Sequence, residues 1–267
     1  MINVENRNRP ELEQLFKKFH HQVSVSSVIE GNLRGKIYVD DLSEPRTGIM
    51  MSPEGAFIAG KPDNQAFNKQ LSIYLEEIIQ TGAPIRDTDD LWFYIDDPKW
   101  VNQFPQLFPS RTPFREDRLH FSCSLPAQDW GRCLPEGYKI IRADSALDVD
   151  SLRFPDDVWD WVKNDLDHYL ERGFGAVLVL DDGVISWCTA DCASGDRCEI
   201  GIITTAGERR KGFGALTVSA ALDFCHRLGF REVGWHCSAN NRGSIATAEK
   251  VGFKEKSKYY AWVCKNE

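Results

Sequence analysis

Hydrophobic and polar positions follow two different periods along the chain, which predicts a mixture of helices and strands. Apolar residues spaced three and four apart predict amphipathic helices, and short alternating or continuous apolar runs between turn residues predict strands. Helices are expected at residues 10–19, 65–80, 98–107, 156–172, 215–228 and 243–251. Strands are expected at residues 36–39, 48–51, 56–59, 91–95, 118–123, 138–141, 174–180, 184–188, 198–204, 232–237 and 259–264.

The order of these elements divides the chain into two halves. Residues 124–137 contain two prolines, two glycines and little periodicity, so we place a domain boundary near Pro135-Glu-Gly137. The predicted domains are residues 1–135 and 136–267. Each half gives hairpin strands, a long helix, a buried strand, a short helix and a final strand. The fold class is therefore predicted as α/β (α+β), and an ancient duplication is a hypothesis, although no residue-level repeat accompanies the shared order.

Composition excludes several classes of protein. With 267 residues, 42% hydrophobic and 27% charged, the chain has the makeup of a packed globular protein. The net charge is −8 and no long basic block occurs, so we expect no nucleic acid partner and a weak preference for cationic substrates. No apolar run is long enough to span a membrane, and the polar first residues do not resemble a signal peptide. The expected location is the cytoplasm.

The cysteines do not indicate a disulfide framework or a metal site. The chain has eight, and Cys188, Cys192 and Cys198 lack the paired spacing of structural zinc knuckles. We expect reduced packing thiols and no metal. His236 and Cys237 are adjacent in a strand and point to opposite faces, so they cannot form a catalytic dyad. His236 is either a proton carrier in a cleft or a satisfied histidine of the core or sheet edge.

The strongest chemical signal is a basic, glycine-containing loop between a strand and a helix. The strand Glu199–Thr204 leads into Arg209-Arg-Lys-Gly212-Phe-Gly214, and a helix follows from Ala215. Glycines allow a tight bend that presents consecutive N–H groups, and a helix N-terminus favours phosphate oxygens. A pyrophosphate fits this loop. For the segment taken alone, a solvated helix start is the alternative.

A second motif follows at the expected spacing: Asn241-Arg-Gly-Ser244, and then Ala248-Glu-Lys-Val-Gly-Phe253. Together, residues 199–264 resemble the acetyl-CoA core of the GNAT N-acetyltransferase superfamily, and in detail a bacterial subfamily that includes self-resistance acetyltransferases. The resemblance implies a GNAT-type mixed central sheet flanked by helices in the second half. Residues 1–135 match no family motif. We interpret them as a smaller α/β domain with a non-catalytic role on the substrate side or at an interface. A degenerate GNAT-like copy is one hypothesis for its origin.

The resemblance also implies a cofactor site. Backbone amides from Arg210 to Ala215 would hold the pyrophosphate, the strand before the loop would pair with pantetheine, and the second motif would line the thiol side. The residues expected to bind acetyl-CoA are Ile202, Ile203, Thr204, Arg209, Arg210, Lys211, Gly212, Phe213, Gly214, Ala215, Asn241 and Ser244.

The implied reaction is direct attack of a primary amine, of a small molecule or peptide, on the thioester in a ternary complex. Glu199 is either the base or an ordinary strand-end glutamate facing water. The family's usual acid is a tyrosine at the position of Ala248, so protonation of the thiolate is left to Ser244, to Tyr259 or Tyr260, or to solvent. The missing tyrosine supports an alternative, a non-catalytic acyl-CoA-binding or regulatory module. The chain is expected to be a monomer or a homodimer.

Overall fold

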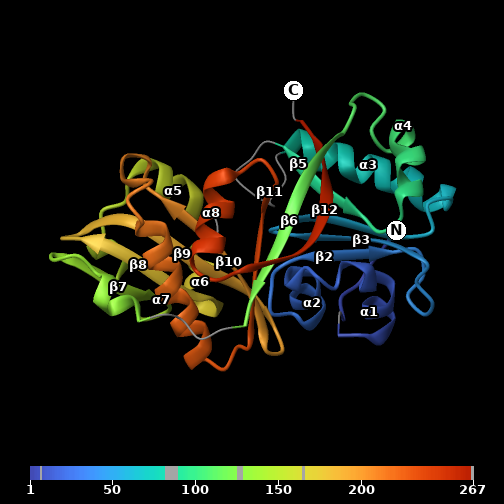
Figure 1. The fold of residues 1–267 in the computed structure, drawn as a ribbon. Coiled ribbons are helices and arrows are strands. Elements are labelled where there is room, and N and C mark those ends of the chain that lie inside the picture. Colours follow the sequence, from blue (N-terminus) through green and yellow to red (C-terminus); the bar gives the residue numbers. More distant parts are fainter. Residues whose placement is uncertain (7, 82–89, 125–128, 164–165, 266–267) are drawn as a thin grey trace. The chain divides into compact units, whose positions relative to one another are not determined.

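The chain folds into two compact α/β units in the computed structural model, which describes residues 1–6, 8–81, 90–124, 129–163 and 166–265 (Figure 1). Unit 1 comprises Met1–Arg118 and Tyr259–Glu267, and unit 2 comprises Leu119–Lys258. The division does not follow the proline- and glycine-rich stretch near residue 135, because two long strands each begin in one unit and end in the other. Among the described residues, no helix is both long and apolar enough to cross a bilayer.

Unit 1 is a mixed sheet with helices on both faces. Its own strands are β1 (Ile2–Asn3), β2 (Lys36–Val39), β3 (Thr47–Ser52), β4 (Gly55–Gly60) and β5 (Leu91–Ile95), and its helices are α1 (Pro10–Phe16), α2 (Val23–Glu30), α3 (Gln65–Thr81) and α4 (Phe104–Leu107). The strands run in the order β1-β2-β3-β4-β5-β12, antiparallel as far as β4 and parallel between β4 and β5. Helices α1 and α2 lie on the opposite face of β2 and β3 from α3 (Figure 1).

Unit 2 repeats this arrangement. Its own strands are β7 (Tyr138–Ala143), β8 (Phe174–Leu180), β9 (Gly183–Ser194), β10 (Arg197–Thr204) and β11 (Glu232–Ser238), and its helices are α5 (Asp156–Val162), α6 (Leu166–Arg172), α7 (Phe213–Arg227) and α8 (Arg242–Lys250). The strand order is β6-β11-β10-β9-β8-β7, and only the pairing of β10 with β11 is parallel among the pairs from β7 to β11. Helix α7 packs on one face through Val218, Ala221 and Cys225, whereas α5 and α6 cover the other.

Both units therefore share one topology: two helices, three antiparallel strands, a helix and a parallel strand. In unit 1 this run is α1-α2-β2-β3-β4-α3-β5, and in unit 2 it is α5-α6-β8-β9-β10-α7-β11. The order that the sequence pattern predicts for the two halves is thus present in the fold, and it agrees with the duplication hypothesis.

The strand that follows each of these runs is exchanged. Strand β6 (Phe114–Cys123) follows the helices of unit 1, but its last residues belong to unit 2, where it neighbours β11. Strand β12 (Lys254–Cys264) follows α8 of unit 2, but Trp262–Cys264 pairs antiparallel with Phe93–Leu91 of β5 in unit 1. Each unit thus completes its sheet with a strand that comes from the other part of the chain.

Most of the predicted elements are confirmed. The helix expected at residues 156–172 forms two, α5 and α6, and two further segments differ. The strands expected at residues 174–180 and 184–188 form a hairpin, β8 and β9, with Asp181 at a φ of 54° in its turn. Residues 98–107 form a 3₁₀ turn, Pro98–Gln103, followed by the four residues of α4, because Pro105 lies inside the segment. The pattern predicts no helix at α2, where Val-Ser-Val-Ser alternates as in a strand. Burial of nearly all its residues and an end at Gly31, with φ 80°, make this segment helical.

Candidate functional site

Strand β10 separates from β11 halfway along its length. The two strands pair in parallel only at Arg197–Glu232, Cys198–Val233 and Glu199–Gly234. The pairing of β10 with β9 continues to Thr204, after a bulge between Glu199 and Gly201. The second half of β10 therefore keeps the edge that faces β11 open among the described residues, and unpaired backbone groups at such an edge can bind an extended ligand.

The basic loop leads from the end of β10 into the start of α7. Arg210 and Gly212 both have left-handed backbone conformations, with φ of 66° and 90°. In the described part of the chain, no acceptor is present for the backbone N–H groups of residues 210–215. Gly214 lies close to β10, since a Cβ there would be 3.1 Å from Thr204 Oγ1. A row of free donors at a helix N-terminus is an anion site.

The cations around the loop fall into two groups. Arg209 donates to the Thr204 carbonyl (2.9 Å) and lies 3.6 Å from Asp157, and Lys211 pairs with Glu208 at 2.9 Å. Within the described ranges, Arg210 and Lys250 have no ion-pair partner. These two cations are therefore available for phosphate, while Arg209 holds the loop against β10.

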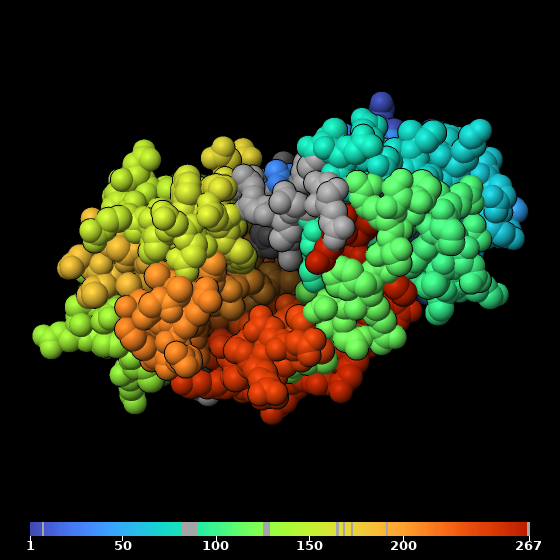
Figure 2. Space-filling view, turned by 90° about the horizontal axis from the view of Figure 1, so that it is seen from above, coloured from blue at the N-terminus to red at the C-terminus, as the bar shows by residue number. Residues whose placement is uncertain are grey.

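A cavity of about 660 Å³ joins the open edge of β10, the loop and α8. Figure 2 shows the orange segment that contains the loop beside the orange-red segment that contains α8. The residues that line this cavity are Ile202, Ile203, Thr204, Arg209, Arg210, Gly212, Gly214, Ala215, Asn241, Gly243, Ser244, Ala246, Thr247 and Lys250. The structure thus brings together every predicted cofactor residue except Lys211 and Phe213.

Lys211 and Phe213 border a neighbouring cavity of about 270 Å³, together with Cys133. The Phe213 ring is buried and packs 4.9 Å from the ring of Tyr138, so it anchors the start of α7. Sequence reasoning did not single out Gly243, Thr247 and Lys250, which line the main cavity from α8. Their spacing of four and three residues puts them on one helical face, a signal that could have identified them.

The second motif caps and positions α8. Asn241 Oδ1 accepts a hydrogen bond from the Ser244 backbone N–H (3.0 Å), so Asn241 is the N-cap of the helix. Trp235 Nε1 donates to Ser244 Oγ at 2.9 Å, which leaves the Ser244 hydroxyl proton free to point elsewhere. Ala248 has no exposed surface and packs in the core cluster that contains Trp235 and Phe253. The position where the family carries its tyrosine therefore lies in the apolar core.

Glu199 is buried beside a histidine. Its residue exposure is 8%, which excludes the interpretation of a strand-end glutamate facing water. His236 Nε2 lies 3.0 Å from Glu199 Oε1, and Cys192 Sγ donates to Oε2 at 3.3 Å. A Cβ at Gly234 would lie 2.8 Å from Glu199 Cγ, so glycine opposite Glu199 makes room for this side chain. A buried carboxylate with a histidine partner is a candidate for proton transfer.

His236 also contacts a residue that sequence reasoning missed. Its ring stacks on that of His120, with centroids 4.6 Å apart and planes 9° from parallel. His120 comes from β6, more than a hundred residues earlier in the chain. No local pattern marks it, because only the pairing of distant strands brings the two rings together.

The remaining candidates have other partners. Tyr259 belongs to unit 1, where its hydroxyl accepts a hydrogen bond from Arg118 Nε at 3.2 Å. The Arg115 guanidinium covers the Tyr260 ring at 4.6 Å, also in unit 1. In unit 2, a hydrogen bond to Cys225 and burial raise the pKa of the Cys198 thiol far above its ordinary value, which makes it a packing group and a poor nucleophile. No cluster of metal-binding side chains occurs among the described residues.

The corresponding place in unit 1 is closed. Strands β4 and β5 stay paired as far as Ile58 and Ile95, and the Asp96 N–H then donates to the Ile58 carbonyl at 3.1 Å. The Asp96 carboxylate also accepts from the Gly60 N–H at 3.1 Å. The end of β4 therefore leaves no slot between the two strands like that in unit 2.

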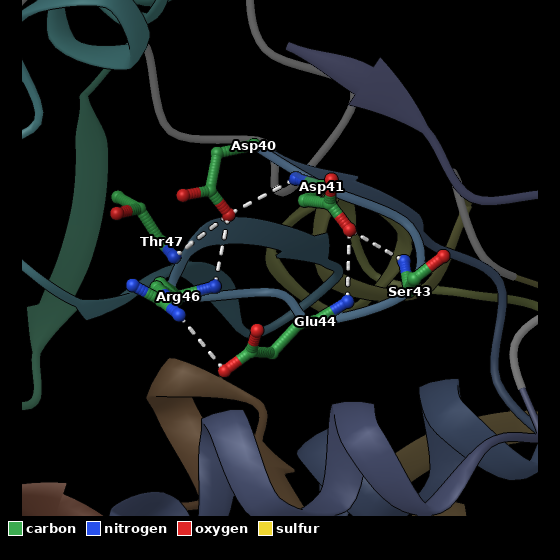
Figure 3. Close-up of polar contacts among 6 residues, drawn as sticks. All are labelled: Asp40, Asp41, Ser43, Glu44, Arg46 and Thr47. Atoms are coloured by element: carbon green, nitrogen blue, oxygen red, sulfur yellow. Dashed lines mark hydrogen bonds and ion pairs between the residues drawn. The ribbon is translucent and has the colours of Figure 1, made fainter.

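Acidic side chains of unit 1 occupy the loops at the start of α3. Asp40 Oδ1 accepts from the N–H groups of Asp41, Arg46 and Thr47 at 2.9–3.1 Å (Figure 3). Its Oδ2 accepts from Asn64 Nδ2 at 2.9 Å, and Asn64 Oδ1 accepts from the Phe67 N–H at 3.1 Å. The N-terminus of α3 is thus capped by Asn64, which is itself held by a carboxylate. A phosphate would meet negative charge here.

Comparison with known proteins agrees with this description. Residues 13–262 match the family model described as GNAT acetyltransferase. The chain is 25% identical over 251 residues to the uncharacterized N-acetyltransferase YdfB of Bacillus subtilis, covering 93% of this chain and 92% of that protein.

Solved structures share the fold. The GCN5-related N-acetyltransferase-like protein from Streptococcus suis superposes with a TM-score of 0.65 at 18% identity, over 95% of this chain and all of that one. A tandem GNAT protein from the clavulanic acid biosynthesis pathway gives a TM-score of 0.58 at 11% identity, over 100% of this chain and 98% of that one. The family model spans both units, including the half in which no motif is evident in the sequence. The chain belongs to the GNAT acetyltransferase family.

Proposed function

We propose that unit 2 transfers an acetyl group from acetyl-CoA to a primary amine by direct attack in a ternary complex. One observation carries the proposal: the cavity joins free backbone donors and two unpaired cations at the loop to an open strand edge that leads back to a buried carboxylate, Glu199. A bound thioester would supply the activated acyl carbon. The chain itself supplies binding, orientation and a place for the proton.

The residues around the cavity fit the parts of the cofactor. The N–H groups of residues 210–215, with Arg210 and Lys250, would hold the pyrophosphate. The open edge of β10 at Ile202, Ile203 and Thr204 would pair with the amide groups of pantetheine. Asn241 and Ser244, at the start of α8, would line the thiol side.

The proton balance requires a base in the site. An ammonium acceptor gives one proton to Glu199, and the neutral nitrogen attacks the thioester carbonyl carbon. The C–N bond forms, the C–S bond breaks, and the departing sulfur takes the second proton of the nitrogen. The products are an amide, a free thiol and one proton that leaves through Glu199.

Protonation of the leaving sulfur does not depend on a tyrosine. Ser244 lines the cavity and can donate its hydroxyl proton while accepting from Trp235. A thiol with a pKa near 8.5 also leaves readily when only water is available. Ser244 or solvent is therefore proposed to relay the second proton of the nitrogen to the sulfur. Tyr259 has a partner of its own in unit 1, Arg118.

Unit 1 is proposed to be non-catalytic. Continuous pairing of β4 with β5, and the Asp40 carboxylate behind the cap of α3, support this role because they close the strand edge and place negative charge at the start of α3. A substrate-side or interface role remains the proposal for this unit.

The alternative is an acyl-CoA-binding module without catalysis, which the buried Ala248 favours. Incubation with acetyl-CoA and a panel of amines, with free thiol followed over time, separates the two functions. Turnover with one or more amines supports the enzyme, and tight binding of CoA without turnover on any amine supports the module.

Glu199 is tested in the same assay. Glu199→Gln is expected to lower kcat and to change the pH dependence of kcat/KM, with little effect on binding of acetyl-CoA. Glu232→Gln, on the neighbouring strand β11, is the matched control and should behave as wild type. An unchanged pH–rate profile in Glu199→Gln would remove Glu199 as the base.

A further inference from the structure

Four side chains on adjacent strands of unit 2 form a row that begins at Glu199. The strands are β10, β11, β6 and β12, in that order across the sheet. Glu199 Oε1 lies 3.0 Å from His236 Nε2, the ring of His236 stacks on that of His120 at 4.6 Å, and His120 Nδ1 lies 3.5 Å from Ser257 Oγ. Each strand contributes one group, so the row runs from strand to strand across the sheet.

Three groups of the row are nearly closed to water, and the fourth, Ser257, is exposed. Glu199 is 8% exposed and His120 is 9% exposed, and the side chain of His236 is 10% exposed. Within the described residues, Glu199 from β10 and His120 from β6 are titratable groups in contact with His236. Cys192 of β9 reaches the other oxygen of Glu199, and the hydroxyl of Ser257 on β12 reaches His120. Charges in this row are therefore weakly screened and act strongly on one another.

Protonation of both stacked rings at once is unfavourable in free energy. Two parallel imidazolium rings 4.6 Å apart repel each other, whereas a single proton on His236 is stabilised by the adjacent Glu199 carboxylate. The two rings therefore take up their protons as a coupled pair, and each ring's titration depends on the state of the other.

We propose that His236 and His120 are positioning residues that control the charge state of the Glu199 base, an inference that rests on the proposed acetyl transfer. A neutral His236 donates its Nε2–H to Oε1, and Oε2, which accepts weakly from the Cys192 thiol, keeps a lone pair that can take a proton. A protonated His236 forms an ion pair with Glu199 and makes it a weaker base. His120 limits the pair to one proton, and because it lies on β6 the first half of the chain contributes to the catalytic unit.

The expected consequence is that protonation of the histidine pair lowers kcat/KM on the acid side of the pH profile. Without the pair, the loss of kcat/KM should begin at lower pH, because no neighbouring cation then weakens the carboxylate base. The proton that Glu199 takes from the ammonium returns to water after each turnover, so no other reactant is needed.

Histidine titration followed by NMR on the free, full-length protein tests the coupling without any substrate. In wild type, the two rings should take up their protons in two separate steps. In His236→Gln, the His120 midpoint should rise. In His120→Phe, which keeps an aromatic ring in the stack, only one of the two steps should remain. His226→Gln, an exposed histidine at the end of α7, should change neither curve.

The positioning role is tested by the pH dependence of kcat/KM. His236→Gln should move the acid limb to lower pH while KM for acetyl-CoA stays within about twofold of wild type. An acid limb that stays in place in His236→Gln overturns the role of His236. Independent titration of the two rings in wild type, or an unmoved His120 midpoint in His236→Gln, overturns the coupling. If no amine is acetylated, the NMR result still decides the coupling, so this failure is distinct from failure of the proposed function.

Discussion

The left-handed residue at the start of α7 gives the sharpest test of the cofactor site. Gly212 has φ 90° and ψ −3°, and a Cβ there would meet only Lys250 Nζ at 3.7 Å. Gly212→Ala therefore introduces no collision, and its whole effect is the backbone cost of an alanine in this region. That cost is about 1–2 kcal/mol for a residue with a Cβ.

The backbone cost of the substitution lowers either the stability of the free protein or its affinity for CoA. If the loop keeps its conformation without cofactor, the free energy of unfolding falls by about 1–2 kcal/mol and the affinity for CoA is unchanged. If the free loop relaxes, stability is retained and the same energy is lost on binding, which raises Kd by roughly 5- to 30-fold. Because both paths lead from the unfolded chain to the bound loop, the two losses should sum to about 1–2 kcal/mol in either case.

Urea unfolding and calorimetric titration with CoA measure the two losses. Gly207→Ala is the matched control, since Gly207 lies in the 3₁₀ turn just before the loop, has no left-handed φ and has nothing within 4 Å of its would-be Cβ. The control should show no loss in either measurement. A summed loss in Gly212→Ala no larger than in Gly207→Ala would refute the assignment of this loop as a rigid cofactor cradle.

Three further predictions follow from burial. Of the eight cysteines only Cys133 is exposed, so maleimide should label one thiol in the native protein and eight in urea. Acetyl-CoA should slow labelling of Cys133, because the cavity beside Cys133 shares Gly212 with the cofactor cavity. Burial raises the pKa of the Cys264 thiol from 9.0 to about 11. A folded-state pKa above the unfolded value gives stability that is present below pH 9 and lost as pH rises toward 11, so the urea midpoint of Cys264→Ser should fall less over this interval than that of wild type. Ala248→Tyr should lower the unfolding free energy by about 1–3 kcal/mol, because a tyrosine ring overpacks the core cluster around Ala248. The variant should not raise kcat. A variant that is as stable as wild type and faster would contradict the burial of this position.

The cofactor end of the site could be predicted from sequence because its parts are local. The loop from Arg209 to Gly214 runs directly into α7, and Asn241 caps the helix that carries Ser244, so short spacings fix which groups share one cavity. The hairpin at Asp181 was likewise marked by its own turn residues. In each case a few consecutive residues contain all the information that the geometry needs.

The rest depends on contacts between distant segments. The alternating Val-Ser pattern of α2 is typical of a strand, and its helical form depends on burial by the surrounding fold. His120 shares no pattern with Glu199, and the two meet around His236 only because β6 lies next to β11. The place of Tyr259 in unit 1 follows from the exchange of β12, and nothing within a strand's own sequence says which sheet it will join.

The exchange of β6 and β12 also sets the order in which the protein can be finished during its synthesis. Strand β5 receives its antiparallel neighbour only when Trp262–Cys264 has emerged, although β5 itself ends at Ile95. At ordinary rates of translation this edge of β5 stays unpaired for roughly ten to thirty seconds. Over that time it is a surface on which nascent chains can associate wrongly, and one that a chaperone would recognise. A gene cut between the two halves should yield fragments that are each missing a strand and that fold only when both are produced together.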